Sequence, residues 1–195
     1  MIETKEPKIF IISGPGGAGK TTLVKRLFRK KIIKENFLKT ISFTTRKKRL
    51  QEKNKKDYFF VSKEEFLKLK KKNFFLETQR VVDDYYGTPG YFYQRAKKEK
   101  KNLILCIDVK GAMYLKKRFK LGKIITIFVW APLKELYERL KKRKEKEEVI
   151  KKRIALTKKE LQFLKKYDYV IINQNIEIAL KVLESILIAE NFRIE

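Results

Sequence analysis

The sequence predicts a three-layer α/β fold in which helices cover both faces of a parallel sheet. Residues 103–107 and 124–130 are almost continuously apolar, as expected of strands that are buried on both faces of such a sheet. Segments with strand and helix patterns alternate along the chain, which favours parallel strands joined by helices. With 195 residues and 43% hydrophobic content, the chain is long enough for one domain with a substantial core.

A glycine-rich turn between an apolar strand, 9–12, and a helical pattern supports the same fold. Residues 14–21 read GPGGAGKT and match G-x-x-x-x-G-K-(S/T), the phosphate-binding loop of the P-loop NTPase fold, in the strand-loop-helix setting that this motif requires. Its glycines let backbone N–H groups approach phosphate oxygens, and the helix dipole adds positive charge. Lys20 would reach the β- and γ-phosphates, and the Thr21 hydroxyl would ligate Mg²⁺. A turn that binds nothing is the less favoured interpretation.

Short elements follow the phosphate loop. Leu23, Leu27 and Phe28 are spaced as one face of a helix. A small region of short strands and turns is then predicted, and a capping box at 62–65 begins a helix inside it. The strands of this region are expected at 40–45, 58–61, 74–82 and 85–88.

The second half of the chain alternates helices with the buried strands. Pro89 is expected to open a helix that runs to about residue 100. The strand at 103–107 ends at Asp108, where open α/β sheets place ligands, although Asp108 could also only cap the following helix. A helix marked by Leu133, Leu136 and Leu140 leads into a highly charged stretch, which is either a solvated surface or a mobile lid. The last strand is expected at 169–172 and a terminal amphipathic helix at 176–188.

Composition narrows the classes of function. The formal charge is +27, but the lysines that carry most of it are spread over the whole chain and form no single basic tail. A dedicated nucleic-acid partner is therefore disfavoured. Histidine is absent, which excludes Ser-His-Asp and Cys-His catalysis, and the single Cys106 cannot form an intramolecular disulfide. The N-terminus lacks a signal-peptide pattern, and no apolar run could span a bilayer, so a cytoplasmic protein without a membrane partner is expected.

Several motifs occur in an order that resembles the guanylate kinase family over nearly the whole chain. They are GPGGAGKTT, Ser42-Phe43-Thr44-Thr45-Arg46 with Arg49, Asp57-Tyr58-Phe59-Phe60-Val61, Phe75-Leu76-Glu77, Asp84-Tyr85-Tyr86-Gly87-Thr88 and Ile107-Asp108-Val109-Lys110-Gly111. The resemblance implies one domain, 1–195, with a core of about 1–39, 89–138 and 154–195, a strand-rich GMP-binding insertion of about 40–88 and a charged lid of about 139–153. It also implies ATP-dependent phosphorylation of GMP, and of dGMP, to the diphosphate with Mg²⁺ as cofactor.

The family resemblance further implies a role for each matching residue. The guanine would be held by Ser42, Glu77 and Thr88, and the GMP phosphate by Arg46, Arg49, Tyr58 and Tyr86. Asp108 would lie near GMP and, with Thr21, near the metal. ATP would be bound by Gly14, Pro15, Gly16, Gly17, Ala18, Gly19, Lys20, Thr21, Thr22 and the segment around Asn173. The groups implied to act in phosphoryl transfer are Lys20, Arg46 and the lid arginines Arg139, Arg143 and Arg153.

The chemistry of these residues agrees with the implied substrates. Guanine presents donors at N1 and N2, and an ionised Glu77 could accept from both, whereas adenine offers no such pair. Arg46 and Arg49, three residues apart near Tyr58, supply fork geometry for a phosphate. The GMP phosphate oxygen is already an anionic nucleophile, so the lack of histidine is no obstacle.

The sequence also departs from the family pattern. Gly16 stands where the family usually has serine, Lys48 where it often has proline, and Gln174 where it often has aspartate. Cys106 replaces an aspartate, which removes a carboxylate near the metal side of the phosphate loop. Two alternatives therefore stay open: a guanylate-kinase-like binding module without activity, or another small-molecule P-loop kinase. A monomer and a homodimer are both compatible with the sequence.

Overall fold

Five parallel strands form the central sheet. The computed structural model describes residues 6–119 and 123–193. In its main sheet, β1 (Ile9–Ser13) lies between β7 (Asn102–Cys106) and β8 (Ile124–Trp130). The order is completed by β2 (Phe37–Lys39) beside β7 and β9 (Tyr169–Ile172) beside β8, and all neighbours pair in parallel. This arrangement confirms the predicted parallel sheet.

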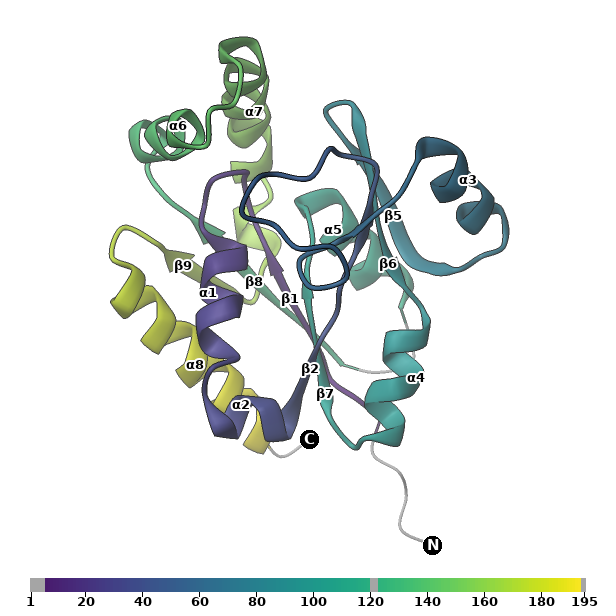
Figure 1. Cartoon of the computed structure of the whole chain (residues 1–195). Helices are drawn as coiled ribbons and strands as arrows, with labels where there is room; N and C mark the ends of the chain where they lie inside the picture. Colours follow the sequence, from purple (N-terminus) through teal and green to yellow (C-terminus); the bar gives the residue numbers. More distant parts are fainter. Residues whose placement is uncertain (1–5, 120–122, 194–195) are drawn as a thin grey trace, which may run out of the picture.

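Helices cover both faces of this sheet because its central strand is apolar on both sides. Phe10 and Ile12 of β1 belong to one buried cluster, whereas Ile9 and Ile11 belong to another. The first cluster is closed by α1 (Lys20–Leu27) and α8 (Ile176–Phe192). The second is closed by α4 (Tyr91–Lys98) and α5 (Val109–Arg118), which lie on the opposite side in Figure 1. The predicted three layers are therefore present.

A second, smaller sheet holds the short strands of the first half of the chain. Its order is β4-β3-β6-β5, formed by β3 (Phe43–Thr44), β4 (Phe59–Phe60), β5 (Phe75–Val81) and β6 (Asp84–Pro89). The helix α3 (Lys63–Lys71) packs against it and begins as the capping box predicts, since the Ser62 hydroxyl accepts a hydrogen bond from the Glu65 N–H at 3.0 Å. The strand-rich insertion is thus a sheet of its own beside the core.

The highly charged stretch forms a helical hairpin at one end of the molecule. It spans the last turn of α6 (Leu133–Lys142), a short loop and the first part of α7 (Glu147–Leu161). In Figure 1 these helices stand above the phosphate loop, on the same side of the core as the small sheet. A short 3₁₀ turn, Leu164–Lys166, then leads back to β9. We call residues 139–153 the lid segment.

Some boundaries differ from the sequence-based expectations. Pro89 ends β6, where it pairs with Phe75, and α4 starts only at Tyr91. A strand end tolerates proline because its missing N–H is not needed in the ladder, so the expectation that Pro89 opens the helix was wrong. A short helix, α2 (Lys31–Asn36), was not anticipated, because six residues carry too little periodicity.

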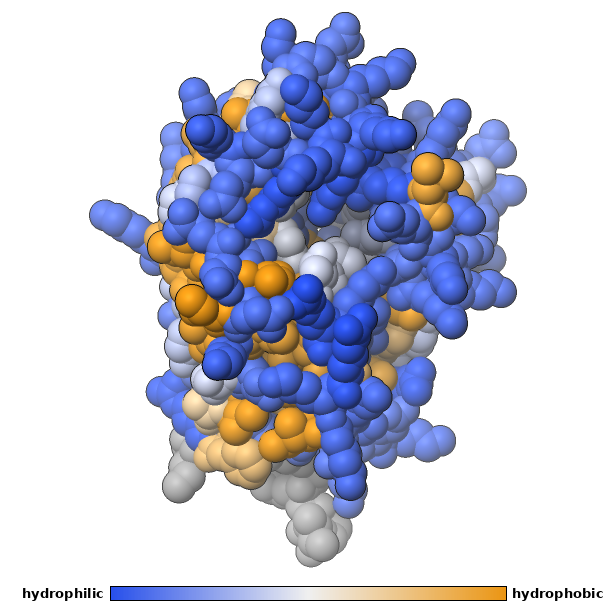
Figure 2. Space-filling view, turned by 60° about the vertical axis from the view of Figure 1, so that its left-hand side comes forward, coloured by the Kyte–Doolittle hydropathy of each residue, from blue (hydrophilic) through white to orange (hydrophobic). Residues whose placement is uncertain are grey.

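The face of the molecule that Figure 2 shows is largely hydrophilic. Figure 2 brings the side of α8 and β9 forward and shows apolar areas there within a charged surround. Ile172 of β9 and Ile178 of α8 are among the exposed apolar side chains. Among the described residues, no helix has both the length and the apolar character needed to cross a bilayer.

The buried aromatic contact between α3 and the small sheet generates the first prediction. Phe66 is fully buried, and its ring stacks on Phe75 and Tyr85 with centroid distances of 4.8 and 5.5 Å. We expect Phe66→Ala to lower the free energy of unfolding by about 3–5 kcal/mol, because it removes both ring contacts and leaves a cavity. Urea denaturation followed by circular dichroism measures the change.

Phe192→Ala is the matched control, because the same side chain is 70% exposed at the end of α8. The control should stay within about 0.5 kcal/mol of the parent protein. Equal losses in the two variants would contradict the structure of this contact.

Candidate active site

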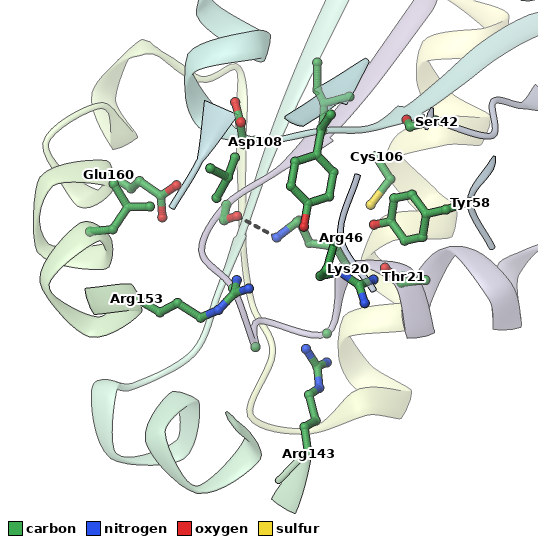
Figure 3. Close-up of a pocket in the computed structure, with 18 of the residues that line it drawn as sticks. Lys20, Thr21, Ser42, Arg46, Tyr58, Cys106, Asp108, Arg143, Arg153 and Glu160 are labelled. Atoms are coloured by element: carbon green, nitrogen blue, oxygen red, sulfur yellow. Dashed lines mark hydrogen bonds between the residues drawn. The ribbon is translucent and has the colours of Figure 1, made fainter. Parts of the chain in front are cut away.

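A cavity lies where the carboxyl ends of β1 and β7 face the small sheet. Parallel strands end at the same edge of a sheet, which is where open α/β folds bind ligands. The cavity brings together residues from the phosphate loop, both sheets and α7 (Figure 3). Among the predicted site residues, those that line it are Gly14, Gly16, Gly17, Gly19, Lys20, Thr21, Ser42, Arg46, Arg49, Tyr58, Glu77, Tyr86, Asp108, Arg143 and Arg153.

The phosphate loop is shaped by a glycine that no other residue could replace without strain. Gly14 has a φ of 130°, and a Cβ at this position would lie 2.0 Å from the Val129 carbonyl oxygen. The Lys20 ammonium donates hydrogen bonds to the Gly14 and Pro15 carbonyls at 2.6 and 2.8 Å. Burial lowers the pKa of Lys20. The lysine is therefore held across the loop, with its ammonium group inside the cavity.

Three buried polar side chains form a chain of hydrogen bonds on the small sheet. The Thr88 hydroxyl donates to Glu77 Oε1 at 2.8 Å, and the Ser42 and Thr88 hydroxyl oxygens are 3.3 Å apart. Glu77 and Thr88 are register partners of β5 and β6, which explains their contact. Burial raises the pKa of Glu77 to about 8, against the opposing hydrogen bond from Thr88. A protonatable acceptor therefore faces the cavity.

Gly111 allows Glu77 to occupy this position. A Cβ built on Gly111 would lie 2.9 Å from Glu77 Oε2 and 3.4 Å from Asp108 Oδ1. A side chain at this position would therefore displace the Glu77 carboxylate from its present place beside α5. The glycine in the Asp108–Gly111 motif thus has a packing reason.

Two arginines of the loop after β3 are paired with carboxylates. Arg46 Nη2 lies 2.8 Å from Glu52 Oε1, and Arg49 Nη2 lies 2.6 Å from Glu145 Oε1. The Arg46 guanidinium also lies 5.5 Å from the centre of the Tyr58 ring. Burial opposes the charge of Arg46, but the hydrogen bond to Glu52 and the nearby Tyr86 and Glu52 groups together outweigh burial and raise the pKa of Arg46. Both arginines are thus charged groups held by carboxylates at the cavity.

The lid arginines differ in where they point. Figure 3 shows Arg143 and Arg153 extending from the lid segment toward the phosphate loop. Arg139 instead lies outside the cavity lining, where its Nη2 donates to Glu135 Oε2 at 2.6 Å and to the Asn173 carbonyl at 2.7 Å. Asn173 in turn donates to the Ala18 carbonyl at 2.7 Å. In this structure Arg139 and Asn173 support the phosphate loop from behind.

Other predicted site residues also lie outside the cavity lining. Ala18 is fully buried and Thr22 is exposed, whereas Thr88 is fully buried and donates its hydrogen bond to Glu77. Pro15 takes part through its carbonyl, which accepts from Lys20. The cavity therefore brings together the phosphate loop and most of the predicted site residues of the small sheet and its loops, but not the segment around Asn173.

Asp108 combines the two interpretations that the sequence left open. Its Oδ1 accepts a hydrogen bond from the Gly111 N–H at 2.7 Å and so caps α5. The same side chain lines the cavity, and burial raises its pKa. Capping thus orients the carboxylate without removing it from the site.

The oxygen donors beside the phosphate loop suit a hard cation. Mg²⁺ in such sites takes few protein ligands and keeps waters and phosphate oxygens, so the hydroxyl of Thr21 and the carboxylate of Asp108 fit it. The described residues include no group of three or more His, Cys, Asp or Glu side chains that could hold a metal without a nucleotide. Cys106 also lines the cavity, and burial raises the pKa of its thiol.

Sequence reasoning missed three carboxylates in or beside the cavity. Glu52 follows Arg49 by three residues, Glu145 interrupts a run of basic residues, and Glu160 lies two helical turns after Arg153 on α7. Glu160 is 8% exposed and lies near Asp108 in Figure 3, and burial raises its pKa to about 7. Spacing from the predicted arginines could have identified Glu52 and Glu160, whereas no spacing reveals the contact of Glu145 with Arg49, 96 residues away.

Comparison with known proteins agrees with this geometry. The family model for guanylate kinase matches residues 6–190. The guanylate kinase of Caldanaerobacter subterraneus subsp. tengcongensis is 42% identical over 98% of this chain and 91% of its own length, and that of Chlamydia felis is 42% identical over 96% and 90%.

A solved structure is similar as well. The crystal structure of guanylate kinase from Anaplasma phagocytophilum superposes with a TM-score of 0.78 at 30% identity, covering 97% of this chain and 88% of the other. A family match that spans nearly the whole sequence agrees with this shared fold. The chain belongs to the guanylate kinase family.

Proposed function

We propose that this protein transfers the γ-phosphoryl group of ATP to GMP, and to dGMP, with Mg²⁺. One observation carries the assignment: the buried Ser42–Thr88–Glu77 chain faces the same cavity as the phosphate loop. An acceptor for a purine base and a cradle for a polyphosphate therefore meet in one space. Family membership supports the same reaction.

Base selection would rest on Glu77. Its ionised carboxylate can accept from both N1–H and the N2 amine of guanine, while the Ser42 and Thr88 hydroxyls hold its orientation. AMP presents no such donor pair and would leave the buried carboxylate without partners. Sites of this kind can discriminate by about 10⁴–10⁵-fold.

Charge neutralisation would bring the two anionic substrates together. Arg46, Arg49, Tyr58 and Tyr86 surround the place where the GMP phosphate would lie, and Lys20, Arg143 and Arg153 reach the phosphate loop. An oxygen of the GMP phosphate attacks the γ-phosphorus, a new P–O bond forms, and the bond to the β–γ bridging oxygen breaks so that its electrons leave with ADP. No general base is needed, because the nucleophile is already an anion.

Mg²⁺ would be held by the Thr21 hydroxyl, with Asp108 close by. When bound, the ion neutralises charge on the β- and γ-phosphates of ATP. The segment around Asn173 and Arg139 would support the adenine side of ATP, and residues 40–88 and 139–153 would act as the GMP-binding region and the lid. We further propose a cytoplasmic enzyme that acts as a monomer or homodimer on small molecules, without a specific nucleic-acid or membrane partner.

Turnover with a panel of nucleotides tests the proposal. In a coupled ADP-release assay with ATP and Mg²⁺, we expect activity with GMP and dGMP and none with AMP, CMP, UMP or dTMP. Glu77→Gln should lower kcat/KM for GMP by at least about 100-fold. The amide has only one acceptor oxygen, and its NH₂ group would face one of the two guanine donors.

Glu64→Gln is the matched control, since Glu64 is exposed on α3 and should leave the activity unchanged. GMP binding without turnover of any nucleotide would refute the kinase assignment. Such a result would leave a non-catalytic binding module.

The raised pKa of Glu77 generates a pH prediction. A carboxyl with a pKa of about 8 is mostly protonated at pH 7, yet guanine needs it ionised, so GMP binding must release a proton. We expect GMP affinity to rise roughly eightfold from pH 7 to 8.5, and Glu77→Gln to remove this rise. Titration calorimetry in buffers of different ionisation enthalpy measures both affinity and proton release.

The raised pKa of Glu77 also makes the stability of the free protein depend on pH. Glu77 ionises at about pH 4.5 in the unfolded chain but only at about pH 8 in the folded chain, so the free energy of unfolding falls as the pH rises between these values. A GMP affinity that does not change between pH 7 and 8.5 would show that Glu77 is already ionised at pH 7.

Cys106 provides a further test on the metal side of the site. We expect Cys106→Asp to fold normally and to retain at least the parent turnover, because the new carboxylate would lie at the end of β7 near Lys20 and Thr21. Steady-state kinetics over a range of Mg²⁺ concentrations measures the effect. A large loss of turnover would show that this position has no room for a carboxylate.

A further inference from the structure

Four guanidinium groups face one cavity and need compensation. Arg46, Arg49, Arg143 and Arg153 all line it, and Lys20 adds another positive charge. The lid segment and the loop after β3 are both rich in basic residues, within a chain of net charge +27. Bringing the lid over the GMP side therefore requires like charges to approach each other, unless an anion lies between them.

Glu145 supplies that anion from the protein itself. Its Oε1 lies 2.6 Å from Arg49 Nη2, and its Oε2 lies 2.8 Å from Arg153 Nε. Arg49 belongs to the loop after β3, 96 residues away in sequence, whereas Arg153 lies on α7. One carboxylate thus joins the lid segment to the GMP side of the cavity.

The local backbone and burial distinguish this contact from an ordinary surface ion pair. Every residue of 141–148 other than Glu145 is exposed, and the Glu145 side chain is only 10% exposed. Lys144 has a φ of 55°, a left-handed conformation that is uncommon for a residue with a side chain, so the chain turns there before Glu145. The lid loop is thus shaped to turn this carboxylate inward.

The contact with Glu145 also leaves the terminal Nη1 and Nη2 atoms of Arg153 available for a phosphate. It contacts Arg153 at Nε, and a Cβ built on Gly16 would lie 2.9 Å from Arg153 Nη1, so the guanidinium reaches the phosphate loop (Figure 3). The short contact between Glu145 Oε2 and Arg153 Nε is an ion pair without hydrogen-bond alignment. The terminal nitrogens of Arg153 therefore point to where the phosphates of ATP would lie.

We propose that Glu145 is a positioning residue that closes the lid over both nucleotides by holding Arg49 and Arg153 against each other across the cavity. This inference rests on the proposed reaction, in which Arg49 binds the GMP phosphate and Arg153 the phosphates of ATP. The shared carboxylate links the two arginines, so ordering of one by its nucleotide favours the position of the other. Glu145 thereby couples the binding of GMP to that of ATP.

Glu145→Gln tests this inference, because it keeps the shape and removes the charge. We expect kcat to fall about tenfold, which is the effect of losing about 1.4 kcal/mol of stabilisation in the closed state. Calorimetry should show that a non-hydrolysable ATP analogue tightens GMP binding to the parent protein and no longer does so in the variant. The affinity for GMP alone should change less than about twofold, and Glu145→Asp should recover part of the coupling.

Glu148→Gln is the matched control, since Glu148 carries the same charge in the first turn of α7 but is exposed. It should retain the parent kcat and coupling. Combining Glu145→Gln with Arg49→Gln should reduce coupling no further than Arg49→Gln alone, because both changes remove the same ion pair.

Binding separates this inference from the proposed reaction. The coupling between GMP and the ATP analogue is measured without turnover, so a parent protein that lacks kinase activity would refute the reaction but still test Glu145. Absence of coupling in the parent protein would overturn the inference. Unchanged coupling in Glu145→Gln would do so too, as would a rise in kcat, which would mean that Glu145 obstructs Arg49.

Discussion

The pairing of β1 with both β7 and β8 is the constraint on which the site depends. In this register Ile12 lies opposite Cys106 on one side and Ile127 on the other, so the phosphate loop and the Cys106–Asp108 segment emerge at the same edge. The two buried clusters stabilise this register, because a shift by one residue would exchange the side chains that face them. Core packing thus places Lys20 and Asp108 in the lining of the same cavity.

The two halves of the site use opposite electrostatics. On the base side, burial raises the pKa of Glu77 and so favours its neutral form, whereas the proposed contact with the two donors of guanine would favour its ionised form. On the phosphate side, permanently charged arginines are held by carboxylate partners such as Glu52. A guanine monophosphate matches both halves, since its base is a donor pair and its phosphate an anion, and an adenine monophosphate matches only one.

Sequence reasoning identified most of the fold because local patterns carry it. Apolar strands and the phosphate-loop motif are readable without tertiary information, and the cavity contains Lys20, Glu77 and Arg153 as the resemblance implied. Local patterns could not show that Arg139 lies outside the cavity lining, since that depends on Glu135 one turn earlier and on the distant Asn173 carbonyl. The pairing of Glu145 was hidden for the same reason: a carboxylate within a basic run looks like solvated surface until its distant partner Arg49 is known.

These carboxylates also offset part of the repulsion that the high net charge creates around the cavity. A chain of charge +27 attracts nucleotides from every side, but the same charge opposes closure of a basic lid over a basic loop. Glu52 and Glu145 are placed where guanidinium groups would otherwise repel one another, and both are mostly shielded from solvent. Salt screens exposed charges more than such pairs, so moderate ionic strength should weaken nonspecific anion attraction before it weakens lid closure. The position of a few acidic side chains, rather than the total charge, then decides how this cavity closes.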